Sequence, residues 1–245
     1  GRILSIPSGI VTAKFLGPSL LGVLAIINLI IQYGSYTQLG LLQSMPRNVP
    51  IAYGKGDKQE VKLIANSVFT GLFFATIFSV LVLWLLFIIG VTFGGILNVP
   101  IMLLVTVILV TTQANSFLRN YVKAEGKFMI MGKLELILKF FTPAVTIPAV
   151  IFFRLNGALF VLLLTGMVSV GYYKVSLKKI ELHFYAKIRK ILYHLKTGFM
   201  IFINQINDSI FWSVDLLILA AMMTTSDVGL YSIALGVLAI APTLS

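Results

Sequence analysis

The sequence predicts an all-α integral membrane protein, and three observations support this fold class. Of the 245 residues, 58% are hydrophobic and only 11% are charged, which leaves too little polar surface to cover a water-soluble domain. The stretches 15–46 and 63–118 contain no charged residue and have room for one and two membrane spans of about 20 residues each. The basic residues gather in the connections between apolar segments. Lipid is therefore the expected solvent of this chain.

Turn residues and basic connections divide the apolar sequence into about eight transmembrane helices. We expect helices at 2–14, 20–43, 63–89, 100–118, 131–153, 157–173, 198–222 and from 227 onward. Gly17-Pro18 ends the first, the run 94–100 separates the third from the fourth, and Asn156 and Thr224-Thr225 mark later turns. Basic connections follow the second, fourth and sixth helices.

The basic residues also predict the orientation in the membrane. Fifteen of the 19 Lys and Arg residues fall in the connections after every second span, so the positive-inside rule makes these loops cytoplasmic. We expect a multi-pass protein of the cell (inner) membrane. The net charge of +11 is explained by these loops, and no nucleic-acid partner is needed to account for it.

The domain organisation follows from one basic segment and one repeat. Apolar residues recur at helical spacing within 174–196, which predicts an amphipathic linker helix in the membrane interface. It would join a six-helix lobe, 1–173, to the start of a second lobe, 197–245. The stretch around Gly22 resembles the one around Gly229, 207 residues later. Six helices per repeat imply two lobes with the same orientation, related by an axis along the membrane normal.

The chain begins at Gly1 and becomes hydrophobic almost at once, so we expect the natural protein to start further upstream. A second full repeat would give the complete protein roughly twelve spans. The sequence lacks Cys, which excludes disulfides and thiolate metal sites.

Four stretches resemble a known family: 15–22, 39–50 with 54–58, 118–128, and 215–231. Together they are similar to the bacterial or archaeal polysaccharide-biosynthesis flippases of the multidrug/oligosaccharidyl-lipid/polysaccharide exporter superfamily. The resemblance implies a MATE-like, two-lobed bundle of six-helix parallel repeats. Relatives commonly follow the seventh-helix Asp with Arg, whereas Leu216 follows Asp215 here, so this chain departs from the family pattern at that pair.

The function implied by this resemblance is transport by alternating access. The cargo would be a lipid-linked oligosaccharide, such as an O-antigen-type glycan on a polyprenyl pyrophosphate, moved from the cytoplasmic to the external leaflet. Glycosyltransferases and a polysaccharide polymerase of the same pathway would be partners, besides membrane lipids. No cofactor is expected, although Na⁺ or H⁺ is a possible coupling ion.

A headgroup carrying pyrophosphate needs cations, because an unpaired charge in hydrocarbon is costly. Lys139 is expected to face the cavity; alternatively it extends to the interface or pairs with Glu135 four residues before it. Arg2 is a second candidate, with an interfacial position as its alternative. Arg47 and Arg119 lie at cytoplasmic helix ends, where they serve as topological anchors or as headgroup ligands.

The seventh helix has the richest polar pattern. Its polar face is predicted from residues at helical spacing, namely Asn204, Asn207, Asp208, Phe211 and Asp215. These residues either line a cavity, where a carboxylate binds a coupling cation or sugar hydroxyls, or form interhelical hydrogen bonds. Asn28 and Gln32 make a weaker pair of the same kind on the second helix.

The sequence contains no phosphate-binding loop, no metal-ligand spacing and no nucleophile with an evident base, so an enzyme is not expected. His183 and His194 fall in the basic linker, where we expect a surface role. Two alternatives to the flippase are a cation-coupled multidrug exporter of the same superfamily and a membrane glycosyltransferase or polymerase. The short external loops, which carry little charge, disfavour the enzyme.

Overall fold

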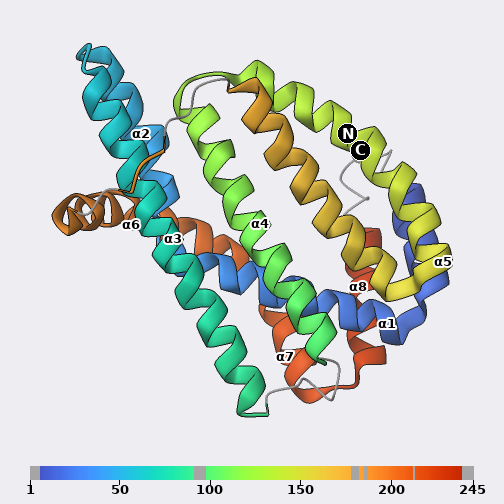
Figure 1. Ribbon diagram of the computed structural model, residues 1–245. Coiled ribbons are helices and arrows are strands. Elements are labelled where there is room, and N and C mark those ends of the chain that lie inside the picture. Colours follow the sequence, from blue (N-terminus) through green and yellow to red (C-terminus); the bar gives the residue numbers. More distant parts are fainter. Residues whose placement is uncertain (1–5, 91–97, 178–181, 185–186, 212, 239–245) are drawn as a thin grey trace.

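The computed structural model describes residues 6–90, 98–177, 182–184, 187–211 and 213–238 (Figure 1). Within these ranges the chain is helical and has no strand, which confirms the all-α class. The elements in chain order are α1 (Ile6–Ser35), η2 (Tyr36–Gln38), α2 (Leu41–Gly54), α3 (Lys58–Ile88), α4 (Val99–Ala124), α5 (Phe128–Ser176), α6 (Ile188–Phe211), α7 (Val214–Met222) and α8 (Thr225–Leu238).

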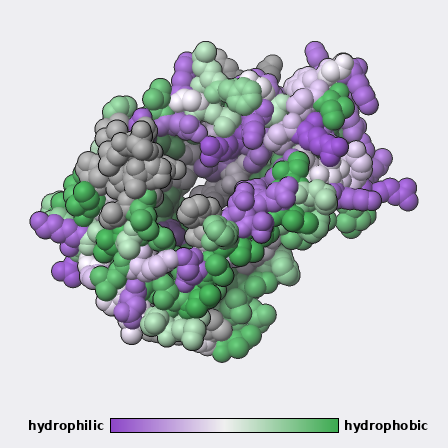
Figure 2. Space-filling model, turned by 180° about the vertical axis from the view of Figure 1, so that it is seen from behind, coloured by the Kyte–Doolittle hydropathy of each residue, from purple (hydrophilic) through white to green (hydrophobic). Residues whose placement is uncertain are grey.

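Four of these helical segments are long and apolar enough to cross a membrane: 9–38, 58–88, 99–124 and 128–176. Large apolar side chains remain exposed on them, such as Ile88 and Phe152, whose exposed fractions are 75% and 78%. Figure 2 shows a broad hydrophobic surface in the lower part of that view, with hydrophilic side chains densest above it. Such a surface fits lipid rather than water, so the chain is a membrane-embedded helical protein.

The connections between helices group at two ends of the bundle (Figure 1). The α2–α3 and α4–α5 connections, which carry the basic residues of the sequence analysis, lie at the top of the view together with the end of α5. The α7–α8 connection lies at the opposite end, with the lower end of α3. This arrangement agrees with basic connections gathered at one end; we call it the basic end of the bundle.

Two long helices each contain the two segments that the sequence predicts. α1 is interrupted at Gly17, whose backbone (φ 69°, ψ 171°) is not helical, in agreement with the predicted Gly17-Pro18 turn. α5 is interrupted at Arg154 (φ 49°, ψ −124°), two residues before the predicted turn at Asn156. A Cβ on Gly157 would lie 2.0 Å from the Ala149 carbonyl oxygen, so only glycine permits so close a return of the chain.

The second predicted helix does not continue unbroken to Gln43. It ends at Ser35, and the short η2 helix and Gly40 (φ 93°) lead into α2. The reason is a tertiary contact, because the backbones of Gly40 and Gly198 touch: a Cβ on Gly198 would lie 1.9 Å from the Gly40 carbonyl oxygen. This contact fixes the beginning of α2 against α6.

The predicted linker helix over 174–196 is helical only in part. α5 extends to Ser176, residues 182–184 are not helical, and α6 begins at Ile188. The His183 N–H donates to Asn66 Oδ1 (3.1 Å) on α3, and the ring of Phe184 lies 5.1 Å from that of Phe73, centre to centre. These contacts with α3 replace the intrahelical hydrogen bonds that a continuous helix would make.

The seventh predicted helix is likewise divided, into α6 and α7 on either side of Ser213. The Ser213 hydroxyl donates to the Ser209 carbonyl (2.7 Å) and lies 2.9 Å from the Tyr33 hydroxyl of α1. A serine that bonds back to the preceding turn bends a helix, and here the bond to α1 holds the bend in place.

Helices α1 and α8 cross at the two glycines that the repeat places in register. A Cβ on Gly22 would lie 1.8 Å from the Thr225 carbonyl oxygen, and a Cβ on Gly229 would lie 1.8 Å from the Pro18 carbonyl oxygen. Thr225 follows Pro18 by the same 207 residues that separate the glycines. The contact is therefore reciprocal, as it is across a two-fold axis.

Candidate headgroup pocket

A basic pocket of about 720 Å³ lies between α2, α4, α5 and α6 at the basic end. Arg47 of α2 and Arg119 and Lys123 of α4 supply its cations. Uncharged polar groups complete it, namely Gln43, Ser116, Asn120 and Gln205. Positive charge beside amides and hydroxyls suits a ligand that is anionic and also carries hydroxyl groups.

The helical repeat of α4 explains how this wall forms. Ser116, Arg119, Asn120 and Lys123 stand at positions i, i+3, i+4 and i+7, so all four side chains share one face of the helix. Phe117 and Val122, which lie on the two flanks of this face, are buried. The packing of α4 on both flanks therefore fixes the direction of its polar side chains toward the pocket.

The far wall is supplied by α6. The Gln43 amide donates to Gln205 Oε1 (2.7 Å), and the Gly40–Gly198 crossing lies close by along the same two helices. The Gln43 Oε1 atom is buried and accepts no hydrogen bond within the part of the chain that the structure describes. It remains available to a hydroxyl donor of a ligand.

A cluster around Glu125 adjoins the pocket, beside a neighbouring hollow that shares Lys123 with it. The Tyr121 hydroxyl donates to Glu125 Oε1 (2.9 Å), the Tyr53 hydroxyl donates to the same atom (3.2 Å), and Lys127 pairs with the carboxylate at 2.6 Å. Burial and the Glu125 charge raise the pKa of Tyr53, which therefore stays protonated as a donor. The cluster ties α2, which carries Arg47, to α4, which carries Lys123.

Two of the four predicted headgroup cations line the pocket. Arg47 and Arg119 meet in the pocket. Lys139 is half-buried on α5 and is not a pocket residue; among the described residues no carboxylate lies within ion-pair distance of it. Glu135 pairs instead with Arg119 (3.0 Å), and since both side chains are more than half exposed the pair contributes little. Arg2 lies outside the described residues.

The predicted polar face of the seventh helix is split by the bend at Ser213. Asn204, Asn207 and Asp208 are exposed on α6, as is Phe211. Asp215 lies beyond the bend on α7, where it accepts a hydrogen bond from the Tyr231 hydroxyl of α8. Interhelical hydrogen bonding, one of the two open interpretations, thus describes Asp215.

Asn28 and Gln32, the pair predicted on the second helix, do not act together. Gln32 donates to the hydroxyl of Tyr36 (3.1 Å), only four residues further along the chain. Asn28 is exposed and has no hydrogen bond among the described residues. Neither residue lines the basic pocket.

The expected surface role of His194 is wrong, whereas His183 is exposed as predicted. His194 is 2% exposed, and its Nδ1 atom lies 3.1 Å from the Asn48 amide of α2. Burial lowers its pKa; the charge of Glu60 raises it and that of Lys190 lowers it. Lys190 and Glu60 form an ion pair (2.8 Å), so this group of residues docks the start of α6 on α2 and α3.

Sequence reasoning missed five polar residues of the pocket, namely Gln43, Ser116, Asn120, Lys123 and Gln205. Lys123 could have been found, because it follows Arg119 by one helical turn on a helix with a clear apolar face. The glutamines could not, since nothing in the sequence indicates that Gln43 and Gln205 meet.

Comparison with protein-family models, with curated proteins and with solved structures finds no match for this chain. Among the described residues no three His, Asp or Glu side chains are grouped so that they could hold a metal ion.

Proposed function

We propose that the chain belongs to a membrane transporter that flips a lipid-linked oligosaccharide from the cytoplasmic to the external leaflet by alternating access. The observation that carries this proposal is the basic pocket at the end of membrane-spanning α4. It gathers helices from both predicted lobes, since α2, α4 and α5 belong to the first and the pocket part of α6 to the second.

The pocket chemistry fits a pyrophosphate attached to a sugar. Arg47 offers a guanidinium fork that matches phosphate oxygens, and Lys123 adds a second cation without a described acidic partner. Amide groups such as Gln43 and Asn120 are suited to sugar hydroxyls. Together these groups would replace the hydration that the headgroup loses when it leaves water, while the lipid tail stays in the bilayer.

The experiment is binding of a polyprenyl diphosphate to the purified protein with both cations reversed, Arg47→Glu with Lys123→Glu. A charged hydrogen bond contributes about 1.5 to 3 kcal/mol, so we expect affinity to fall at least about tenfold. The matched control is Lys55→Glu, which reverses an exposed cation near the same basic end but outside the pocket. Unchanged affinity in the double variant would reject the pocket as the headgroup site.

A second candidate, a cation-coupled multidrug exporter, is favoured by one observation. The Asp208 carboxylate is exposed on α6 beside Asn204 and Asn207 and makes no ion pair within the described part of the chain. If cells expressing Asp208→Asn lose drug export, while Arg47→Glu leaves that export unchanged, the exporter replaces the flippase. Loss of glycan flipping in the Arg47→Glu variant supports the flippase.

A further inference from the structure

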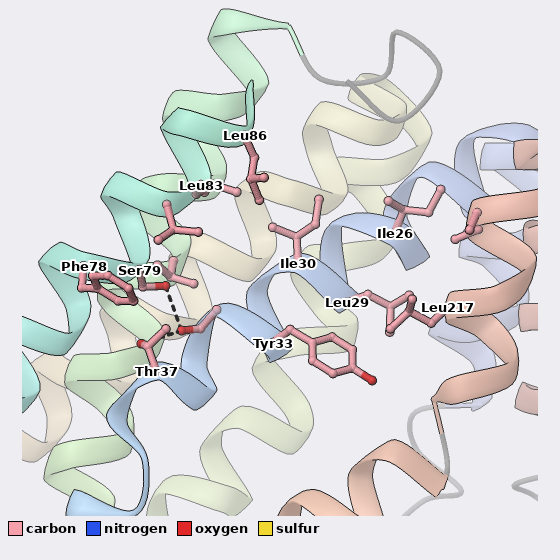
Figure 3. Close-up of a pocket in the computed structure, with 15 residues that line it drawn as sticks. Ile26, Leu29, Ile30, Tyr33, Thr37, Phe78, Ser79, Leu83, Leu86 and Leu217 are labelled. Carbon is pink, nitrogen blue, oxygen red and sulfur yellow. Dashed lines mark hydrogen bonds between the residues drawn. The ribbon is translucent and has the colours of Figure 1, made fainter. Parts of the chain in front are cut away.

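A second cavity, of about 360 Å³, lies apart from the basic pocket and shares no residue with it. Its walls come from α1, α3 and α7 (Figure 3), and Leu109 of α4 also lines it. None of the 15 lining residues is charged. Two of these walls, α1 and α3, belong to helical segments that are long and apolar enough to cross a membrane.

The cavity has a buried floor and an exposed rim. Its floor is closed by Ile26 and Leu109, which are 3% and 1% exposed. Its rim is formed by Phe78, Leu86 and Leu217, whose exposed fractions are 61%, 43% and 42%. The exposed rim places the opening of the cavity among apolar side chains at the surface of the molecule.

The polar atoms along the cavity are already engaged. Ser79 and Thr37 both donate to the Gly34 carbonyl, at 2.8 and 3.0 Å, and Figure 3 shows these two bonds converging. The Tyr33 hydroxyl points away from them and lies 2.9 Å from the Ser213 hydroxyl. Each lining hydroxyl thus already has a hydrogen-bond partner within the protein. None is left over to bind a water molecule or a polar headgroup, and apolar cavities stay dry.

We propose that this cavity holds an acyl chain of a bilayer phospholipid, inserted between α3 and α7. A hydrocarbon chain is the ligand class that an uncharged cavity with an apolar rim accepts. The headgroup of that lipid would remain at the membrane surface, since the cavity offers it no charge. The acyl chain packs against Leu217 and Ala220 of α7 and Phe78 of α3, and so connects the two predicted lobes through a bound lipid.

The test is the lipid content of the protein after extensive detergent washing, measured by mass spectrometry. We expect a phospholipid to be retained by the wild type and its amount to fall roughly tenfold in Ala220→Phe, in which a benzyl group fills the cavity. The matched control is Ala234→Phe, which places the same group on an exposed position of α8 and should retain the lipid.

A second measurement does not depend on a variant that could misfold. Wild-type protein in vesicles that contain a phospholipid with a photoreactive acyl chain should give adducts on α3 near Val82 and on α7 near Leu217. Equal phospholipid retention in Ala220→Phe, or adducts that avoid both helices, overturns the proposal. Retention of a polyprenyl lipid in place of a phospholipid also overturns it, because the cavity would then belong to a different lipid.

Discussion

His194 links the charge of one side chain to the docking of α6. The Asn48 amide nitrogen donates to its Nδ1 atom, so the neutral ring carries its proton on the buried Nε2 atom, which has no hydrogen-bond partner within the described ranges. A second proton would go to Nδ1, where it would face the amide donor of Asn48. Burial lowers the pKa of this imidazole below the ordinary 6.5. The facing charges, Glu60 on α3 and Lys190 on α6, are already paired with each other.

The free energy of unfolding should therefore fall as the pH falls below about 6.5. In that range His194 takes up a proton in the unfolded chain but not in the folded chain. The loss of stability levels off once the pH is below the lowered pKa of the folded state. We expect the Tm of the wild type to drop between about pH 7.5 and about pH 5.5, with a smaller drop in His194→Gln. The exposed His183→Gln is the control and should keep the wild-type pH dependence. Parallel profiles for all three proteins would contradict this account.

At the scale of helices, glycine pairs set how closely elements approach. Gly22 faces Gly229 between α1 and α8, and Gly40 faces Gly198 between α2 and α6. In lipid, where apolar burial between helices adds little, close backbone packing is a main source of helix association. These two crossings attach α6 to α2 and α8 to α1.

We expect Gly22→Ala and Gly229→Ala each to destabilise the fold by about 1 to 3 kcal/mol, because the added methyl group would overlap a backbone carbonyl. The double variant should cost less than the sum, since one separation of the helices relieves both overlaps. Gly171→Ala on α5 is the control: no atom lies within 4 Å of its added Cβ, so its effect should be neutral or slightly stabilising. Thermal unfolding in detergent measures all four. Additive losses would argue against a shared contact.

The sequence predicts those features of the elements that depend on local chemistry. Apolar length gives the helices, Gly17-Pro18 gives the break in α1, and the repeat pairs Gly22 with Gly229 before any contact is known. The bend at Ser213 could not be predicted, because it depends on a hydrogen bond to Tyr33, 180 residues away. The burial of His194 was missed for the same reason, since its neighbours come from α2 and α3.

At the scale of the whole molecule, the backbones of the two predicted lobes come into close glycine contact at two places in the described ranges. One is the reciprocal α1–α8 crossing next to the break at Gly17, and the other is the α2–α6 contact beside the basic pocket. If the proposed transporter alternates between two open states, α1 and α8 have to separate when it opens at the end away from the basic pocket. A covalent bond across that crossing should then stop the cycle.

The absence of Cys from the sequence makes this test clean. The hydroxyl oxygens of Ser19 and Thr225 lie 3.4 Å apart across the crossing, so Ser19→Cys with Thr225→Cys places two thiols where they can be oxidised to a disulfide. Each single cysteine variant is a control that cannot form this bond within one chain.

The most direct measurement is the movement of a fluorescent sugar linked to a polyprenyl diphosphate across proteoliposomes that contain this double variant. The account predicts transport in the reduced protein and in both single variants, arrest after oxidation, and recovery with a reductant. Absence of transport by the reduced protein would contradict the proposed flippase. Transport that continues at the same rate in the cross-linked protein would contradict the separation of α1 from α8.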